Sequence, residues 1–268
     1  SGRKEVLEMA TTEAAHRKIL TELKNPDQQA IVAAPLEGNY LVLAGPGAGK
    51  TRVIVHRVAW LLRESLVLPE EIMVLTYNRS AALEVRCRLW ELVGPDSAGV
   101  AIQTLHGLAM RLTGTSYAVA AEHGEAINFS SVIKDATAYL RRAEAGEDLG
   151  ASVTRDKVLG GLRYLLVDEY QDINGEHYDL ISAVAGRTLN TDEDKVSLMV
   201  ASHDEQNVYA FGGASVEYIR RFESEYAARR FHLVENYRST HHIINCANKV
   251  IARSKERMKG DHEIRINF

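Results

Sequence analysis

Residues 40–51 read YLVLAGPGAGKT, and this stretch decides the fold. The apolar run Tyr40–Ala44 has the length and composition of a buried strand, and the glycine-rich loop after it leads directly into an amphipathic helix. Strand, glycine-rich loop and helix in this order predict a P-loop. In such a loop the backbone N–H groups of Gly45, Gly47 and Gly49 surround phosphate oxygens, helped by the positive end of the helix.

The two residues that close the motif bring the chemistry. In the pattern GxxxxGK[ST], Lys50 reaches the β- and γ-phosphates, and the hydroxyl of Thr51 ligates Mg²⁺. Ala44 takes the first glycine position, which is a common small-residue relaxation. The sequence therefore predicts an ATP–Mg²⁺ site, and the nucleotide is expected to contact the whole loop: Gly45, Pro46, Gly47, Ala48, Gly49, Lys50 and Thr51.

A carboxylate at the end of a second buried strand should complete this site. Residues 165–172 read LLVDEYQD, and the acids Asp168 and Glu169 follow the apolar run directly. Asp168 is predicted to hold Mg²⁺, and Glu169 to orient and deprotonate the attacking water. An Asp-Glu pair alone is weak evidence, because helix N-termini also favour acids. The P-loop upstream makes the pair specific.

The rest of the chain alternates strands with helices. Five further apolar runs predict strands: Ile72–Thr76, Val100–Gln103, Tyr164–Val167, Leu198–Ala201 and Phe231–Val234. Helical periodicity marks four segments between or after them: Thr51–Leu62, Ser80–Leu92, Gly175–Val184 and Thr240–Ile251. This alternation predicts an α/β fold with a mostly parallel sheet and helices on both faces.

One segment interrupts that alternation. Residues 114–160 contain no clear strand, and RRAEAGEDLGAS within them is polar and charged. Val132–Leu140 has the character of a helix, and Ala143–Ser152 that of a mobile connector. We expect a small, mostly helical insertion at 114–160 that splits a main domain made of 1–113 and 161–268.

The composition sets wider bounds. With 268 residues, 46% of them hydrophobic and 25% charged, the chain has the make-up of an ordinary globular protein. It has no apolar run of about 18 residues, so no membrane span is expected. Cys87 and Cys246 have no CxxC spacing, which is typical of free thiols in a reducing, cytoplasmic setting. His241 and His242 lie near Cys246, but without the spacing of a zinc site.

The net charge of −4 gives no support for nucleic-acid binding. It does not exclude such binding either, because a groove that stacks bases on aromatic rings needs few local charges. The last residues, SKERMKGDHEIRINF, contain no closing element, and we expect the chain to be a fragment of a longer protein.

Further motifs, in order along nearly the whole chain, make the sequence similar to a known family. NPDQQ at 25–29 resembles a Q motif, TYNRSAALEVR at 76–86 resembles TFTNKAAxEM, and TLHGLAMRL at 104–112 resembles TFHSF. VDEYQD at 167–172 has the family's own acidic motif, DEQNVYAFGGA at 204–214 resembles DDQSIYxFRGA, and VENYRST at 234–240 matches the next motif. The chain resembles the first RecA-like domain of the UvrD/Rep family of superfamily 1 DNA helicases.

This resemblance implies roles around the nucleotide. Gln28 would read the adenine edge, because a carboxamide both donates and accepts hydrogen bonds there. Tyr237 would stack on the adenine, and Arg238 would contact the γ-phosphate with its planar donor fork. Arg52 would approach the phosphates, and Gln206 would sense the γ-phosphate and link hydrolysis to DNA movement.

The resemblance also implies a path for single-stranded DNA across this domain. Aromatic side chains along such a path provide platforms on which bases stack, and polar side chains contact the phosphate backbone. The residues at matching positions are Tyr77, His106, Tyr209 and Phe211 for the bases, and Asn78 and Arg79 for the backbone.

Three departures from the family pattern concern the DNA path and the coupling of ATP to DNA. Asn78, Arg79 and Ser80 replace Thr-Asn-Lys. Ser202 and His203 replace the Gly-Asp before the glutamine motif, and Gly212 replaces the arginine of FRGA. ATP binding is therefore a firmer expectation than efficient translocation.

The leading hypothesis is the ATP-binding half of a 3′-to-5′ DNA helicase or recombination motor, whose second RecA-like domain is absent from this chain. The alternative is an ATP-gated DNA-binding or scaffold module that has lost motor coupling. An unrelated P-loop ATPase, such as a partitioning or transport motor, has no reason to carry VDEYQD and NYRST together.

Overall fold

The computed structural model describes residues 14, 17–116, 127–144, 155–187, 195–203, 215–251 and 264–266. Within these residues, six strands form one sheet in the order β3-β2-β4-β5-β1-β6, and every pairing in it is parallel. The strands are β1 (Tyr40–Ala44), β2 (Ile72–Thr76), β3 (Ala101–Thr104), β4 (Tyr164–Val167), β5 (Ser197–Ser202) and β6 (Arg229–Leu233). All six predicted strands are confirmed, with shifts of one or two residues at some ends.

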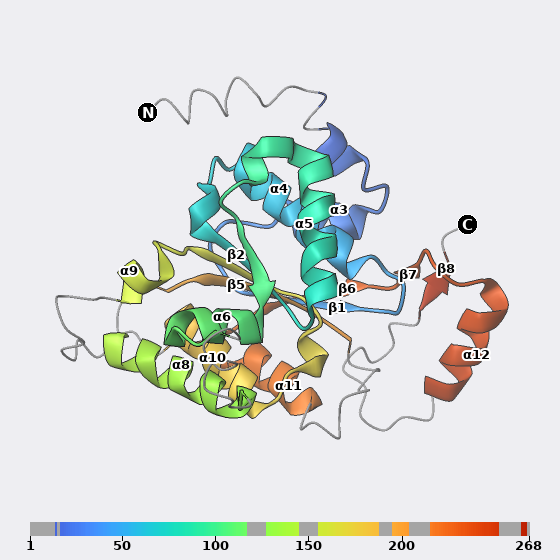
Figure 1. Cartoon of the computed structure of the whole chain (residues 1–268). Helices are drawn as coiled ribbons and strands as arrows, with labels where there is room; N and C mark the ends of the chain where they lie inside the picture. Colours follow the sequence, from blue (N-terminus) through green and yellow to red (C-terminus); the bar gives the residue numbers. More distant parts are fainter. Residues whose placement is uncertain are drawn as a thin grey trace.

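Helices cover both faces of the sheet (Figure 1). Side chains of a strand alternate between its two faces, so Leu41 and Leu43 of β1 join one hydrophobic cluster while Tyr40 and Val42 join the other. The second cluster includes residues of η1 (Arg17–Thr21), α3 (Pro26–Val32), α4 (Lys50–Arg63) and α5 (Arg79–Val93). The first includes residues of α6 (Leu105–Thr113), α8 (Phe129–Glu144), α10 (Gly175–Ala185) and α11 (Val216–Glu225).

Local sequence signals set where the main helices begin. Helix α4 begins directly after Gly49, the last P-loop residue before the helix, which has φ 84°. The apolar stripe of α4, with Val53, Ile54 and Val58, is buried. Helix α10 begins with a capping box between Asn174 and His177, which satisfies free N–H groups of its first turn. The predicted parallel sheet with a helix after β1 thus places the P-loop at the carboxyl edge of the sheet.

The predicted helix Val132–Leu140 lies inside α8. Its residues Ile133, Ala136 and Leu140 are buried in the same hydrophobic cluster as α6 and α10. A short helix, α9 (Arg155–Leu159), follows. Most of the expected mobile connector, residues 145–152, lies outside the described residues. A separate inserted subdomain at 114–160 stays a prediction.

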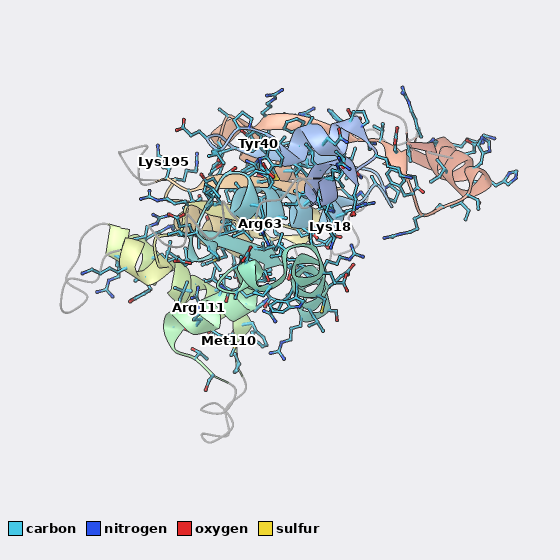
Figure 2. All side chains as sticks on the ribbon, turned by 90° about the horizontal axis from the view of Figure 1, so that it is seen from above. Lys18, Tyr40, Arg63, Met110, Arg111 and Lys195 are labelled. Carbon is cyan, nitrogen blue, oxygen red and sulfur yellow. The ribbon has the colours of Figure 1, made fainter. Side chains whose placement is uncertain are left out.

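The remaining elements are short or lie at one end. They are η2 (Pro69–Glu71), η3 (Gly94–Ser97), η4 (Tyr170–Asp172), the two-residue strands β7 (Glu235–Asn236) and β8 (Arg265–Ile266), and α12 (His241–Ile251). Both views show α12 at one end of the molecule (Figures 1 and 2). In Figure 2, Met110 and Arg111 of α6 lie on the opposite side of the view from Tyr40 of β1. Helix α6 follows β3, the strand at one edge of the sheet. Among the described residues, no helix combines the length and apolarity needed to cross a membrane.

Candidate functional site

The P-loop glycines are required by conformation and by space. Gly47 has φ 68° and Gly49 has φ 84°, a region that other residues rarely adopt. A Cβ on Gly47 would also come within 2.7 Å of the Arg238 side chain, and a Cβ on Gly49 within 2.9 Å of the Gln28 amide. The loop is therefore packed directly against the residues that the sequence assigns to the rest of the nucleotide site.

The two predicted metal ligands are in contact. The Thr51 hydroxyl donates a hydrogen bond to Oδ2 of Asp168 over 2.8 Å, although 117 residues separate them. Asp168 is 2% exposed, and burial raises the pKa of its carboxyl to about 6, with a further contribution from Glu169. A raised carboxyl pKa indicates a buried negative charge with insufficient compensation. This oxygen pair therefore fits a hard divalent cation such as Mg²⁺.

Lys50 and Glu169 form an ion pair across the same site. Lys50 Nζ lies 3.1 Å from Glu169 Oε2, and the lysine is almost fully buried while the glutamate is one-third exposed. Glu169 has φ 53° and ψ 47°, and it is one of few described non-glycine residues with positive φ. Such a backbone conformation is common at functional sites, where neighbouring contacts hold it in place.

Residues assigned to the adenine side lie against the P-loop. The Gln28 side chain is buried, and its amide donates to the Ala48 carbonyl over 2.9 Å. The Tyr237 N–H donates to the Gly47 carbonyl over 3.0 Å, while its ring is 44% exposed. An exposed ring beside the loop is available to stack on a base. The exposed Arg238 follows it in the chain.

Two asparagines that sequence reasoning missed hold this arrangement together. Asn25 caps α3 by accepting from the N–H groups of Asp27 and Gln28, and its amide donates to the Tyr237 hydroxyl over 3.0 Å. It therefore fixes Gln28 and Tyr237 relative to each other. The Asn-Pro-Asp start of α3 is a cap signal that could have identified Asn25.

The second asparagine is Asn236. Its amide donates to the Pro46 carbonyl in the P-loop, and its Oδ1 accepts from the N–H groups of Arg238 and Ser239. Asn236 is fully buried. It ties the P-loop to the turn that carries Tyr237, and asparagine is a typical residue for such a side-chain-to-backbone turn.

Arg52 binds the backbone of the segment before α3. Its Nη2 donates to the Glu22 carbonyl over 3.1 Å, and the residue lines a cavity of about 490 Å³ together with Lys18 and Glu91. The approach of Arg52 to the phosphates stays a prediction.

A second cavity gathers four of the predicted DNA-binding residues. It has a volume of about 230 Å³ and is lined by Tyr77, Asn78, Arg79, Thr104, His106, Gly107, Met110 and Phe129. The His106 ring lies edge-on to Phe129 and to His177, each with centroids 5.2 Å apart. Burial lowers the pKa of His106, which favours its neutral ring. Sequence reasoning missed Phe129, because its approach depends on how α8 packs.

The coupling motif, residues 204–214, lies outside the described residues, together with its Gln206, Tyr209, Phe211 and Gly212. His203, directly before them, is buried at the end of β5, and its N–H donates to the Gln171 carboxamide oxygen over 3.0 Å.

Comparison with known proteins identifies the family. The model of the UvrD/REP helicase N-terminal domain matches residues 24–123 and 115–227. The chain belongs to this family. It is 29% identical to DNA helicase II of Escherichia coli over 89% of this chain and 42% of the relative. It is also 29% identical to the ATP-dependent DNA helicase PcrA of Staphylococcus epidermidis, over 86% and 40% respectively. The chain thus spans about two fifths of the length of these relatives.

Among solved structures, the Pif1 helicase of Candida albicans matches with a TM-score of 0.49 and 17% identity, over 85% of this chain and 44% of that one.

Proposed function

We propose that this UvrD/REP family domain binds ATP with Mg²⁺ and forms the nucleotide-binding half of a motor that moves on single-stranded DNA in the 3′-to-5′ direction. The observation that carries the proposal is the convergence of two motifs. The Thr51 hydroxyl and the Asp168 carboxylate are 2.8 Å apart, and Lys50 and Glu169 pair beside them at 3.1 Å.

Each residue of the site has its own role in ATP binding or hydrolysis. The P-loop N–H groups and Lys50 bind the phosphates, Gln28 and Tyr237 orient the base, and Thr51 with Asp168 holds the metal. When bound, Mg²⁺ neutralises charge on the phosphate oxygens. Glu169 accepts the proton of the attacking water, and Arg238 and Gln206 complete the site on the γ-phosphate side.

The cavity around His106 supports the DNA part of the proposal. It is lined by the rings of Tyr77, His106 and Phe129, with Asn78 and Arg79 beside them. Bases stack on such rings with little sequence preference, and polar groups contact the backbone. The assignment of Tyr209 and Phe211 to the same path stays part of the proposal.

Substitution of Glu169 by glutamine in the full-length protein tests the hydrolytic role. The amide keeps the shape but cannot accept a proton, so we expect unchanged ATP affinity and a fall in DNA-stimulated turnover of about 10²–10⁴-fold. Phosphate release is the measurement. Turnover within a few-fold of the parent excludes Glu169 as the base. Unwinding assays with 3′- and 5′-tailed duplexes then test the polarity.

The second candidate function is an ATP-gated DNA-binding module. It is favoured by His203, directly before the coupling motif, and by Gly212 within it, which replace the family's residues. A full-length protein that hydrolyses ATP only slowly, without stimulation by DNA, and yet binds DNA more tightly with ATP would support this module over the motor.

A further inference from the structure

Gln171 connects two parts of the site through one buried side chain. It lies in the turn η4 (Tyr170–Asp172) directly after the acidic pair and is 6% exposed. Its Nε2 donates to Glu169 Oε2 over 2.5 Å, and its Oε1 accepts the N–H of His203 over 3.0 Å. Both ends of the carboxamide are therefore used, one by the carboxylate of the proposed base and the other by the end of β5.

Lys50 and Gln171 share the same oxygen of Glu169. Lys50 Nζ lies 3.1 Å from Oε2, on which Gln171 also donates. Within the part of the chain that the structure describes, the other oxygen, Oε1, has no hydrogen-bond donor. The two contacts restrain Oε2 and leave Oε1 as the oxygen that can accept a proton.

The two donors are not equivalent once nucleotide binds. Lys50 belongs to the P-loop, where its charge is directed to the β- and γ-phosphates, so its contact with Glu169 weakens. The Gln171 amide has only a weaker second acceptor, Asp172 Oδ2 at 3.5 Å, and its oxygen already accepts the His203 N–H, so binding of phosphate does not draw it away from Glu169. A neutral amide also holds the carboxylate without contributing a proton or a charge of its own.

We propose that Gln171 is a positioning residue for ATP hydrolysis, which holds the Glu169 carboxylate in its reactive orientation and ties that orientation to the end of β5 at His203. This inference rests on the proposed role of Glu169 as the base. It also gives a physical route between the coupling motif and the reaction, because residues 204–214 follow His203 directly in the chain.

Two substitutions in the full-length protein test the contact with Glu169, one with the His203 bond kept and one without it. Gln171→Glu keeps the acceptor for His203 but presents a carboxylate to Glu169, so it repels the base. Gln171→Met keeps the length and removes both hydrogen bonds. A displacement of about 1 Å at a reacting group costs about 10²-fold in rate. We expect turnover with single-stranded DNA to fall by about that factor in both variants, while the Kd for a non-hydrolysable ATP analogue stays within threefold.

Asn39 offers a matched control at the opposite edge of the sheet. Its half-buried carboxamide likewise uses both ends, here between two backbone groups, donating to the Tyr226 carbonyl over 3.1 Å and accepting the Leu198 N–H over 3.0 Å. Asn39→Leu should lower the melting temperature, with kcat unchanged. A fall of kcat in both variants by the same factor would mean that loss of a carboxamide bridge, and not positioning, is responsible.

A double variant distinguishes failure of this inference from failure of the proposed function. If Glu169 is the base and Gln171 acts through it, Gln171→Met causes no further loss of turnover in a Glu169→Gln background. Normal turnover in Glu169→Gln refutes the proposed function itself. If Glu169→Gln is inactive while Gln171→Glu and Gln171→Met are fully active, only the positioning role is refuted.

Discussion

Protonation of His177 should weaken this fold as the pH falls from 7 to 4. The ring is 6% exposed, and its Nε2 has no hydrogen-bond partner among the described residues. Burial, with a smaller effect of nearby His106, lowers the pKa of His177 from 6.5 to about 4. Between these pH values His177 is protonated in the unfolded chain but neutral in the folded chain, so the free energy of unfolding decreases as the pH falls.

The magnitude follows from the two pKa values. Their difference, from 6.5 to about 4, corresponds to about 3 kcal/mol at about 1.4 kcal/mol per pH unit. His177→Gln removes the titration and keeps a residue that suits the third position of a capping box. We expect the variant to lose about 3 kcal/mol less stability than the parent between pH 7 and pH 4.

Urea unfolding of residues 1–268, followed by circular dichroism at several pH values, measures this difference. Asp168 acts in the opposite direction, because its pKa is raised to about 6 and the folded state binds its proton more readily. That contribution is common to parent and variant and cancels in the comparison. His242→Gln, at an exposed position of α12, is the control. Parallel pH profiles of the parent and His177→Gln would refute the reasoning.

Two further predictions concern ligands. Tyr237→Ala should weaken binding of a fluorescent ATP analogue by about 1 kcal/mol, roughly fivefold in Kd, because stacking is lost. Tyr237→Phe should restore most of the affinity. Equal affinity in the parent and both variants would place the adenine elsewhere. Tyr77→Ala and Phe129→Ala should each weaken binding of labelled single-stranded DNA, measured by fluorescence anisotropy, by about 1–3 kcal/mol. Trp90→Ala is their control, because that ring is 55% exposed on α5 and does not line the cavity; equal losses in all three would indicate non-specific contact.

The strands and the meeting of Thr51 with Asp168 could be predicted because their signals are local. An apolar run followed by a glycine-rich loop specifies β1 and α4 without knowledge of the rest of the chain. Parallel strands end at the same edge, so Thr51 and Asp168 were expected to meet, and they do. Asp168 follows a strand adjacent to β5, which in turn pairs with β1.

The contacts that depend on long-range packing could not be predicted. Asn236 reaches Pro46 across 190 residues of sequence, and its strand β7 is only two residues long and has no pattern of its own. Phe129 reaches His106 only because α8 buries Ile133 and Leu140 against its neighbours. Nothing in the local sequence of GKTR indicated that Arg52 would bind the Glu22 carbonyl.

The most direct test of the account is a calorimetric titration of residues 1–268 with a non-hydrolysable ATP analogue, with and without Mg²⁺, beside Lys50→Ala and Asp168→Asn. The account predicts measurable binding that strengthens with Mg²⁺ in the parent, is lost in Lys50→Ala, and no longer depends on Mg²⁺ in Asp168→Asn. Absence of binding by the parent, or binding of the same strength in all three proteins with or without Mg²⁺, would contradict the assignment of this loop and this carboxylate to an ATP–Mg²⁺ site.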